Sequence, residues 1–310
     1  MSQSDGEVID RLLRGAVDPH CHPFPSPFPR RIDIEEAARQ YQDAGFRAFV
    51  AKSHHHSTAT EVALLERHGL SDAGIQTFGA IALNNQVGGL NPHAVNLCLA
   101  FGGKVVWFPT IASPAHIEHS RGHDLKFPNA SIPMLPDQPI DIFDRSGKLK
   151  PEVHEILRMV AEADAVLAGG HMPPAWILAL FEAARDAGVT RMVMNHPNFV
   201  IEASKEEALK AADLGAVIEH SICMYDDEST FHLWEIDVLV DWIRAIGVER
   251  SQLGSDLGQE NNPLPVDSYR KTCLRLLDGG LSESEVRSLV ADVPARLLGL
   301  DGDGASATDA

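Results

Sequence analysis

Two histidines separated by one residue, His20 and His22, are the side chains of this sequence with the clearest chemical potential. They follow an apolar run at 15–19 that predicts a first β-strand, and a proline-rich run at 23–29 comes after them. Because side chains alternate along a strand, histidines at positions i and i+2 lie on the same side. Two adjacent imidazoles can bind one divalent metal ion. The pair fits an ordinary turn equally well, so its meaning depends on ligands at the ends of other strands.

Short apolar segments, rich in small or β-branched residues, recur along the chain and predict parallel strands buried on both faces. They cover residues 16–20, 46–52, 75–83, 104–109, 165–170, 191–196, 216–221 and 252–256. Helical patterns lie between them at 34–44, from Pro92 onward, at 174–187, after a capping box at 204–207, and at 231–246. Most of these helices end at a glycine shortly before the next strand, as a repeated β/α unit requires.

This alternation in a chain of 310 residues predicts an α/β protein, a closed (β/α)8 TIM barrel. An open doubly wound sheet is the alternative. It would need a glycine-rich phosphate loop after a strand, and Gly88-Gly89 lacks the GxGxxG form. The barrel is therefore the favoured architecture.

The division of the chain follows from the same pattern. We expect a helical segment at 1–14, one domain at 15–300, and a disordered tail at 301–310. Residues 111–150 interrupt the repeat between the fourth and fifth strands, and we expect them to form a lid or pocket wall that includes a small hairpin around 144–147.

The composition is ordinary for a globular protein, with 44% hydrophobic and 23% charged residues. A net charge of −18 argues against nucleic acid as a partner, since its phosphates would be repelled. The four cysteines form no CxxC pair, which fits a reducing cytoplasm. No basic and apolar leader begins the sequence and no apolar run reaches membrane-spanning length. We therefore expect a cytoplasmic protein without a membrane partner.

Many of the fifteen histidines fall at the carboxyl ends of the predicted strands, and these ends converge on one mouth of a barrel. The strand-end residues with ligand or proton-transfer chemistry are Lys52, His54, His55, His56, His171, His196, His220 and Asp256. Imidazoles with a carboxylate suit zinc, manganese or iron, and we expect one or two such ions, zinc first. A divalent ion lowers the pKa of a bound water, and Asp256 would accept the proton from that water.

The arrangement resembles the amidohydrolase superfamily of metal-dependent hydrolases. Its pattern is HxH after the first strand, a histidine after the fifth and another after the sixth, and an aspartate after the eighth. Here the matching residues are His20, His22, His171, His196 and Asp256. The run at 292–299, Asp-Val-Pro-Ala-Arg-Leu-Leu-Gly, is also similar to the C-terminal NPARLLGL stretch common there. The resemblance implies a TIM barrel whose metal ligands are these five residues.

The sequence departs from that pattern in one place. Members with two metals usually bridge them with a carboxylated lysine or a glutamate after the fourth strand, and the run 105–110 contains neither. Lys52, after the second strand, is either a displaced carboxylated bridge or a lysine that orients substrate. A ligand there also resembles the polymerase-and-histidinol-phosphatase (PHP) phosphoesterases, but Asp256-Leu-Gly258 lacks the histidine that ends their motif. The whole pattern also resembles an uncharacterised amidohydrolase-like family.

Two assignments stay open at this point. Among the consecutive histidines, His54 is the expected ligand because it lies closest to the predicted strand end. His220 is either a hydrogen-bond donor to substrate or a structural histidine beside Glu219.

The resemblance implies a hydrolase that cleaves an amide, imide, lactone or ester bond in a small molecule, with Asp256 as proton shuttle. The alternatives are a PHP-like phosphoesterase, a single-metal decarboxylase and a metal-binding protein without turnover. Barrels of this kind commonly pair, so we expect a homo-oligomer.

Overall fold

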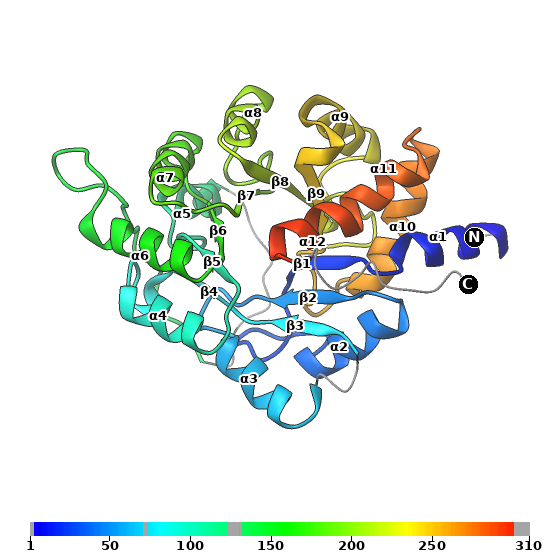
Figure 1. Ribbon diagram of the computed structural model, residues 1–310, viewed down its shortest axis with the longest axis horizontal. Coiled ribbons are helices and arrows are strands. Elements are labelled where there is room, and N and C mark those ends of the chain that lie inside the picture. The colour runs from blue at the N-terminus through cyan, green and yellow to red at the C-terminus, as the bar shows by residue number, and fades with distance from the viewer. Residues whose placement is uncertain (1–2, 71–73, 123–129, 131, 301–310) are drawn as a thin grey trace.

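The computed structural model describes residues 3–70, 74–122, 130 and 132–300. The tail expected at 301–310 lies outside the described residues, as do 123–129 and 131 of the insertion. Two parallel sheets, ordered β1-β2-β3 and β4-β5-β6-β7-β8-β9, form the centre of the molecule (Figure 1). The strands are β1 (Val17–Cys21), β2 (Ala48–Ala51), β3 (Gln76–Phe78), β4 (Ala80–Ala82), β5 (Val105–Trp107), β6 (Val166–Ala168), β7 (Met192–Asn195), β8 (Ala216–Ser221) and β9 (Ser251–Gly254).

The two sheets are parts of one barrel. β3 and β4 are two pieces of the single strand predicted at 75–83, separated only by Gly79. At the other junction, the backbone N–H of Asp256 donates to the carbonyl of His20 at 2.7 Å, and that of His22 donates to the carbonyl of Leu257 at 2.7 Å. The end of β1 is thereby joined to the residues that follow β9. The TIM barrel predicted from the sequence is confirmed, with each strand end within a few residues of its expected position.

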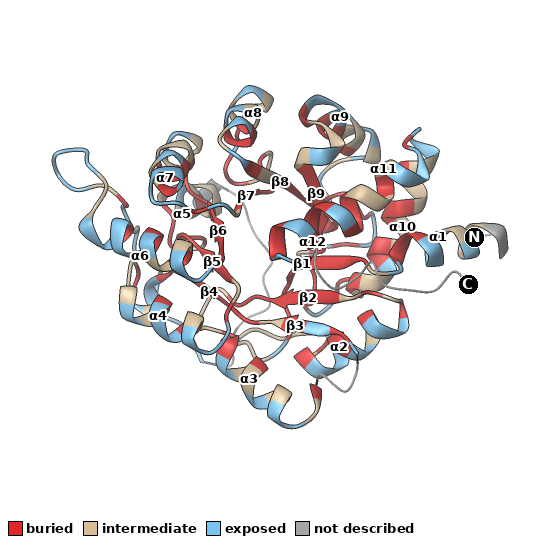
Figure 2. Ribbon diagram, viewed as in Figure 1, coloured by how far each residue is buried: buried red, intermediate tan, exposed pale blue. Residues whose placement is uncertain are grey.

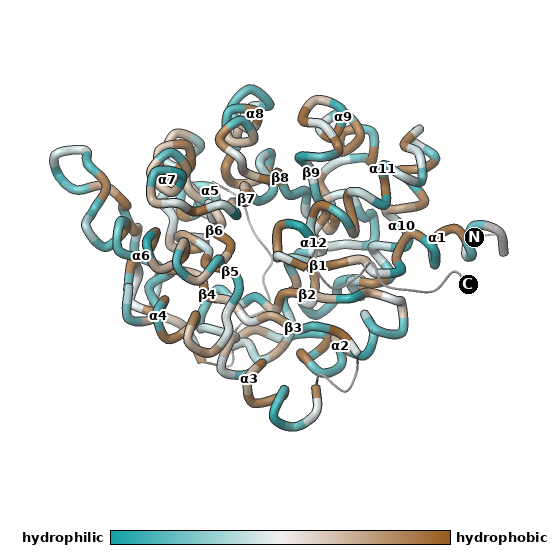
Figure 3. Tube along the Cα trace, viewed as in Figure 1, coloured by the Kyte–Doolittle hydropathy of each residue, from teal (hydrophilic) through white to brown (hydrophobic). Residues whose placement is uncertain are grey.

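Helices surround the strands (Figure 1). They are α1 (Gln3–Leu13), α2 (Ile34–Asp43), α3 (Ala59–Arg67), α4 (Pro92–Ala100), α5 (Pro114–Gly122), α6 (Pro151–Glu162), α7 (Pro174–Asp186), α8 (Lys205–Asp213), α9 (Ile236–Ile246), α10 (Pro265–Asp278), α11 (Glu283–Arg287) and α12 (Val293–Leu298), with short turns η2 (Asn85–Val87), η3 (Ile222–Met224), η4 (Val248–Arg250) and η5 (Ser288–Asp292). The strands are buried and the outward helix faces are exposed (Figure 2). Apolar residues gather on the strands and on the helix sides that face them (Figure 3).

Two sequence predictions about helices were wrong. The helix expected at 231–246 begins only at Ile236, because the side chain of Asn262 accepts hydrogen bonds from Ser229 and Thr230 and holds this segment in a turn. The insertion at 111–150 was expected to be a loop with one hairpin. It also contains α5, which Pro114 begins. The hairpin itself is present, as an antiparallel bridge between Phe143 and Leu149.

One end of the barrel is closed by the C-terminal helix. Alternate strand residues, Val50 and Trp107 among them, fill the interior, and Leu297 and Leu298 of α12 pack onto the same cluster. Arg191, just before β7, donates to the carbonyl of Arg296 at 2.5 Å, which places α12 at the amino ends of the strands. The carboxyl ends therefore remain free for a site, as in other barrels of this type.

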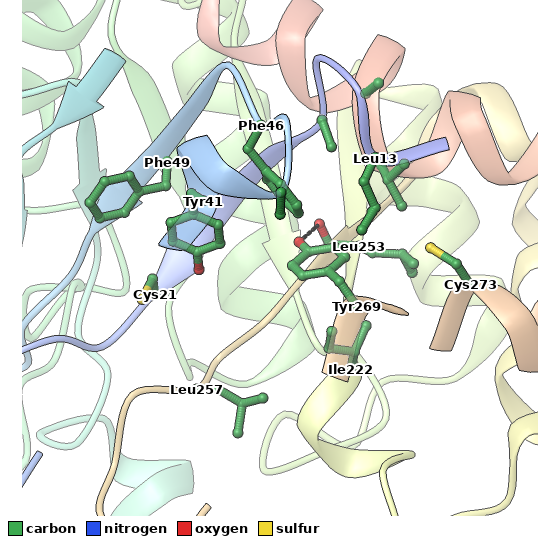
Figure 4. Close-up of a cluster of buried hydrophobic side chains, with 14 of the residues drawn as sticks. Leu13, Cys21, Tyr41, Phe46, Phe49, Ile222, Leu253, Leu257, Tyr269 and Cys273 are labelled. Carbon is green, nitrogen blue, oxygen red and sulfur yellow. Dashed lines mark hydrogen bonds between the residues drawn. The ribbon is translucent and has the colours of Figure 1, made fainter. Parts of the chain in front are cut away.

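A register shift between Asp18 and Cys21 interrupts the pairing of β1 with β2. Such a bulge re-aims side chains. The carboxylate of Asp18 lies in the outer layer, where it accepts the hydroxyl of Tyr41 and the backbone N–H of Ser255, the latter at 2.9 Å. Tyr41 belongs to a cluster of buried hydrophobic side chains (Figure 4). In the same cluster, the hydroxyl of Tyr269 donates a hydrogen bond to the carbonyl of Leu253 at 3.0 Å. The bulge allows the carboxylate of Asp18 to bind the backbone at the seam between β1 and β9, while His20 and His22 face the interior of the barrel.

Among the described residues, no helix has both the length and the apolar character that crossing a membrane requires.

Candidate metal centre

Five imidazoles form a ring at the carboxyl ends of the strands. The distance between the centroids of neighbouring imidazoles is 5.2 Å for His20 and His22, 4.8 Å for His22 and His54, and 5.8 Å for His54 and His171. The circle closes with 4.8 Å between His171 and His196 and 6.2 Å between His196 and His20. All five side chains are largely or fully buried, and burial lowers their pKa values below the usual range, so the imidazoles are neutral. Neutral imidazole is the form that binds metals.

Asp256 brings a carboxylate into this ring. One oxygen, Oδ1, lies 3.2 Å from Nε2 of His20 and 3.0 Å from Nε2 of His22, and Oδ2 lies 4.0 Å from Nε2 of His196. Within the described residues, one group of histidine, cysteine and carboxylate side chains has the spacing of a metal site. It consists of His20, His22 and Asp256, whose ligand atoms all lie within 4.8 Å of one another.

Glu219, on β8, orients His20. Its Oε1 lies 2.6 Å from Nδ1 of His20, and its carboxylate also accepts hydrogen bonds from Asn195 at 2.9 Å and Gln252 at 3.2 Å. A carboxylate that accepts from Nδ1 leaves Nε2 as the free ligand atom, directed at Asp256. Burial raises the pKa of Glu219, against the hydrogen bond from Asn195. Sequence reasoning missed this residue as part of the site. The available signal was a carboxylate inside an otherwise apolar strand.

Lys52 follows β2 and is buried beside the same histidine. Its Nζ lies 2.8 Å from Nε2 of His20 and 4.8 Å from the centre of the Trp107 ring. Burial lowers the pKa of Lys52 to about 8. The amine therefore reaches the candidate ligand atoms, as a bridging or orienting lysine must.

The three consecutive histidines diverge. His54 joins the imidazole ring, and its Nδ1 lies 2.8 Å from the hydroxyl of Thr110, which Asn84 also contacts at 2.7 Å. His55 lies against Phe28, with 5.2 Å between the ring centroids. His56 is 2.9 Å from the hydroxyl of Ser53 and outside the imidazole ring. The structure thus brings only His54 into the ring, the residue favoured on sequence grounds.

His171 owes its position to the glycine before it. Gly170 has a φ of +64°, and a Cβ there would meet the carbonyl oxygen of Phe108 at 2.3 Å. This close approach turns the chain so that His171 enters the ring. Its Nδ1 lies 2.8 Å from Nδ1 of His116, on α5, and the two imidazoles stack with 4.9 Å between centroids. Sequence reasoning did not select His116 as a site residue, because it lies in the insertion and not at a strand end.

Two of the candidate ligands have unusual backbone conformations. His196 has a φ of +27° and Asp256 a φ of +52°, both in the region that L-residues rarely occupy. Strain of this kind concentrates at functional sites, where the surrounding structure holds it. In both residues it occurs at the point where the strand ends and the side chain turns toward the imidazole ring.

The residues present fit a divalent metal ion. Nδ1 of His22 and Nδ1 of His196 are buried without a hydrogen-bond partner among the described residues, and the Nε2 atoms of His20, His22 and His196 all face the carboxylate of Asp256. Several neutral imidazoles around one carboxylate form the donor set that zinc, manganese and iron prefer.

The structure does not bring His220 to this group. Along β8, alternation turns Glu219 inward to His20, and His220 outward, where its ring lies 6.4 Å from that of Trp242 on α9. Both ring nitrogens are buried without a hydrogen-bond partner among the described residues, and burial lowers the pKa of His220 to about 3. The sequence-based suggestion that His220 contacts substrate is corrected, because its strand position faces the helical layer.

A pocket of about 530 Å³ opens above the ring. Its lining includes His22, His54, His171, His196 and Asp256 from the site. The insertion contributes residues of α5 and the segment 134–137, so its described part forms a wall of the pocket. Phe28 and Phe199 supply apolar surface, and Arg30 and Arg121 supply the guanidinium groups.

Solved structures share this fold at low sequence identity. An amidohydrolase from Pseudomonas aeruginosa is 12% identical, covers 95% of this chain and 98% of its own, and superposes with a TM-score of 0.60. The probable dipeptidase PvdM from the same organism is 12% identical, with coverages of 96% and 97% and a TM-score of 0.62. The 2,6-dihydroxybenzoate decarboxylase from Rhizobium is 11% identical, with coverages of 93% and 100% and a TM-score of 0.53. The expected resemblance of the fold to that of an amidohydrolase is confirmed.

No curated protein matches this sequence significantly. One family model, described as "Family of unknown function (DUF6282)", matches residues 15–219, which include every strand from β1 to β7 and most of β8. The chain therefore belongs to this family, and the matched residues include His20, His22, His171 and His196.

Proposed function

We propose that this protein is a metal-dependent hydrolase that cleaves an amide, imide, lactone or ester bond of a small molecule. The observation that supports this most is the group of His20, His22 and Asp256, whose ligand atoms converge beneath a pocket at the open end of the barrel. An inert metal store needs no such pocket, and a structural metal needs no open side.

His20, His22 and Asp256 would hold the ion, with His171 and His196 completing the ligands. Zinc is the first expectation, and manganese or iron fit the same donors. A bound divalent ion supplies a Lewis acid for the carbonyl oxygen and lowers the pKa of a water.

Asp256 is the residue that moves the proton. Its side chain is 16% exposed, the one carboxylate of the group that opens to the pocket. Burial raises its pKa, but the interactions of the carboxylate with His20 and Lys52 lower the pKa more, so the net shift is downward. An ionised carboxylate at neutral pH can accept a proton from water and later deliver it to the leaving group.

Lys52 has one of two roles, and the metal count separates them. As a carboxylated bridge it would join two ions. As a free amine beside His20 it would orient the substrate carbonyl near a single ion. Elemental analysis of the purified protein distinguishes two ions per chain from one.

The phosphoesterase alternative is the weaker proposal. It needs a cationic wall for a phosphate, and the pocket lining within the described residues contains only two guanidinium groups, those of Arg30 and Arg121. Arg121 is exposed at the rim. The motif Asp256-Leu-Gly258 also lacks the terminal histidine of that family.

The experiment is a hydrolysis screen. The protein, reconstituted with zinc, manganese or iron, is presented with lactones, imides, amides and esters in water labelled with oxygen-18. We expect turnover with one labelled oxygen in the product. Release of carbon dioxide without label would instead identify a decarboxylase, and absence of turnover across all classes with metal bound would support a binding protein.

Asp256→Asn is the decisive variant. We expect it to keep metal and lose turnover, because the amide can still coordinate but cannot accept the proton. Asp213→Asn, a matched change at an ion pair with Arg250 in the outer layer, should leave turnover unchanged. Full activity of Asp256→Asn would overturn the mechanism. We further propose a cytoplasmic homo-oligomer, which sedimentation and cell fractionation can test.

A further inference from the structure

Arg30 is a partly buried arginine of the pocket lining that has no anionic partner in the part of the chain that the structure describes. Its Nε is buried and makes no hydrogen bond, and no carboxylate lies within ion-pair distance of its guanidinium among the described residues. Many other arginines in the described residues pair with carboxylates or donate to carbonyls. The neighbouring Arg31, for example, donates to the carbonyl of Asn262. A buried guanidinium without a partner carries a desolvation cost that only a ligand can offset.

The position of Arg30 is fixed by the barrel. It forms an antiparallel bridge with Gln259, and the backbone N–H of Arg31 donates to the carbonyl of Gly258 at 2.9 Å. The chain that follows β1 is therefore attached to the chain that follows Asp256. Gly258 permits this, since a Cβ there would meet the carbonyl oxygen of His22 at 2.2 Å. Arg30 is thus held in place before any ligand arrives.

The guanidinium of Arg30 acts as a positive charge on the groups around it. Its charge lowers the pKa values of His22 and His55, with burial as the larger cause in each. Burial also lowers the pKa of Arg30 itself, to about 10, so the group stays charged at neutral pH. Arg30 therefore adds one positive charge to the same pocket that His22 and Asp256 line.

Apolar side chains make up much of the remaining pocket lining. Phe28, Ile117, Phe199 and Met224 line it, and Met134 and Leu135 of the insertion lie at its edge with 37% and 88% of their surfaces exposed. Apolar side chains exposed beside a pocket mark a surface that a ligand covers.

We propose that Arg30 binds a carboxylate of the substrate, so that the substrate class is a small carboxylic acid with an apolar body and a hydrolysable carbonyl. The inference rests on the proposed function, because it takes this pocket as the substrate site. A planar guanidinium fork matches a carboxylate with two parallel hydrogen bonds. A phosphate dianion would require a denser cationic wall than Arg30 and the exposed Arg121 form.

The test measures binding and needs no turnover. 3-Phenylpropionate and its uncharged analogue 3-phenylpropanamide are titrated calorimetrically into the wild-type protein, both metal-loaded and after chelation. We expect the acid to bind more tightly than the amide in both forms. Equal binding of acid and amide would show that no charged group of the pocket selects the carboxylate, and would overturn the proposal. A preference that vanishes with the metal would show that the metal and not Arg30 holds the carboxylate.

Variants of Arg30 then test whether this residue causes the preference for the acid over the amide. Arg30→Met should weaken binding of the acid about tenfold or more and leave binding of the amide unchanged, as expected for loss of a charge-assisted pair. Arg30→Lys should retain part of the preference, since it keeps the charge without the fork. Arg145→Met, which removes one charge from the exposed hairpin, is the matched control and should bind both ligands as wild type does. An unchanged acid affinity in Arg30→Met would overturn the proposal.

Three further outcomes are informative. Unchanged binding of the amide shows that Arg30→Met is folded. If that variant does not fold, the relative affinities of Arg30→Lys for acid and amide decide whether Arg30 binds the carboxylate. Phenyl phosphate that binds more tightly than the acid, in a manner that requires Arg30, would contradict the carboxylate assignment. Acid binding without any hydrolysis in the screen would leave this inference standing and remove the proposed function.

Discussion

Oε1 of Glu219 lies 2.6 Å from Nδ1 of His20, and both side chains are buried. The two residues are far apart in the sequence, on β8 and β1, and the barrel brings them together. The contact leaves Nε2 of His20 directed at Asp256. A carboxylate behind a metal-binding histidine fixes its tautomer and raises its basicity, so this pair should set metal affinity.

Replacing Glu219 by glutamine should therefore lower zinc affinity. We expect a loss of about 10- to 100-fold, the usual effect of removing the partner of a metal-binding histidine. Competition with a chromogenic chelator measures it. Glu61→Gln, which changes the carboxylate beside His56, is the control. If the Glu219 variant bound zinc like the wild type, His20 would not be a ligand.

Asp18 should matter for stability through the seam between β1 and β9. Its carboxylate accepts the backbone N–H groups of His20 at 3.0 Å and Ser255 at 2.9 Å, as well as the hydroxyl of Tyr41. In Asp18→Leu these buried donors lose their acceptor, at about 1–3 kcal/mol for each. Chemical denaturation should show the loss. Tyr41→Phe removes one donor only and should cost about 0.5–1.5 kcal/mol. Equal stability of Asp18→Leu and wild type would contradict this role.

His220→Leu should leave metal affinity unchanged and raise the free energy of unfolding. Both ring nitrogens are buried without a partner among the described residues, a penalty of about 1–3 kcal/mol that an apolar side chain of similar volume avoids. Thermal unfolding and zinc titration measure the two quantities. A loss of turnover with metal content intact would restore the catalytic role suggested by the sequence.

Metal removal should lower the melting temperature. An ion that binds only the folded state stabilises it by about 2.7 kcal/mol at a hundred times its dissociation constant. Calorimetry with and without a chelator measures the shift. His22→Asn should melt at the same temperature under both conditions, because its ligand atom facing Asp256 is gone. A wild-type protein insensitive to chelation would argue against a metal at this site.

A variant of His116 tests whether the insertion at 111–150 contributes to metal binding. Its Nδ1 lies 2.8 Å from Nδ1 of His171, and α5 carries it over the ring. His116→Ala should leave the fold intact and weaken metal binding only a fewfold, since His171 loses a neighbour but stays in place. A loss as large as that of His22→Asn would make His116 a direct ligand.

Much of the fold and of the candidate site could be predicted from the sequence, because local patterns along the chain indicate both. Short apolar strands and glycine-terminated helices repeat, and the side-chain types at strand ends are visible without a structure. In a barrel all such ends meet at one mouth, so the placement of His20, His22, His171, His196 and Asp256 in one region follows from strand order alone. The error at 231–235 lies where the side chain of a distant residue, Asn262, holds the backbone. The helix missed within 111–150 begins at Pro114, which is a local signal.

The sequence by itself thus determined the barrel and the set of candidate ligands, because periodicity and order along the chain encode both. Only the tertiary structure decided that Glu219 faces inward and His220 outward, and that His54 and not His55 or His56 joins the imidazole ring. It also decided that the Arg30 guanidinium has no ion-pair partner among the described residues. Each of these depends on the direction of one side chain and on residues far away in the chain, and small rotations at strand ends set such directions without changing the pattern of the sequence.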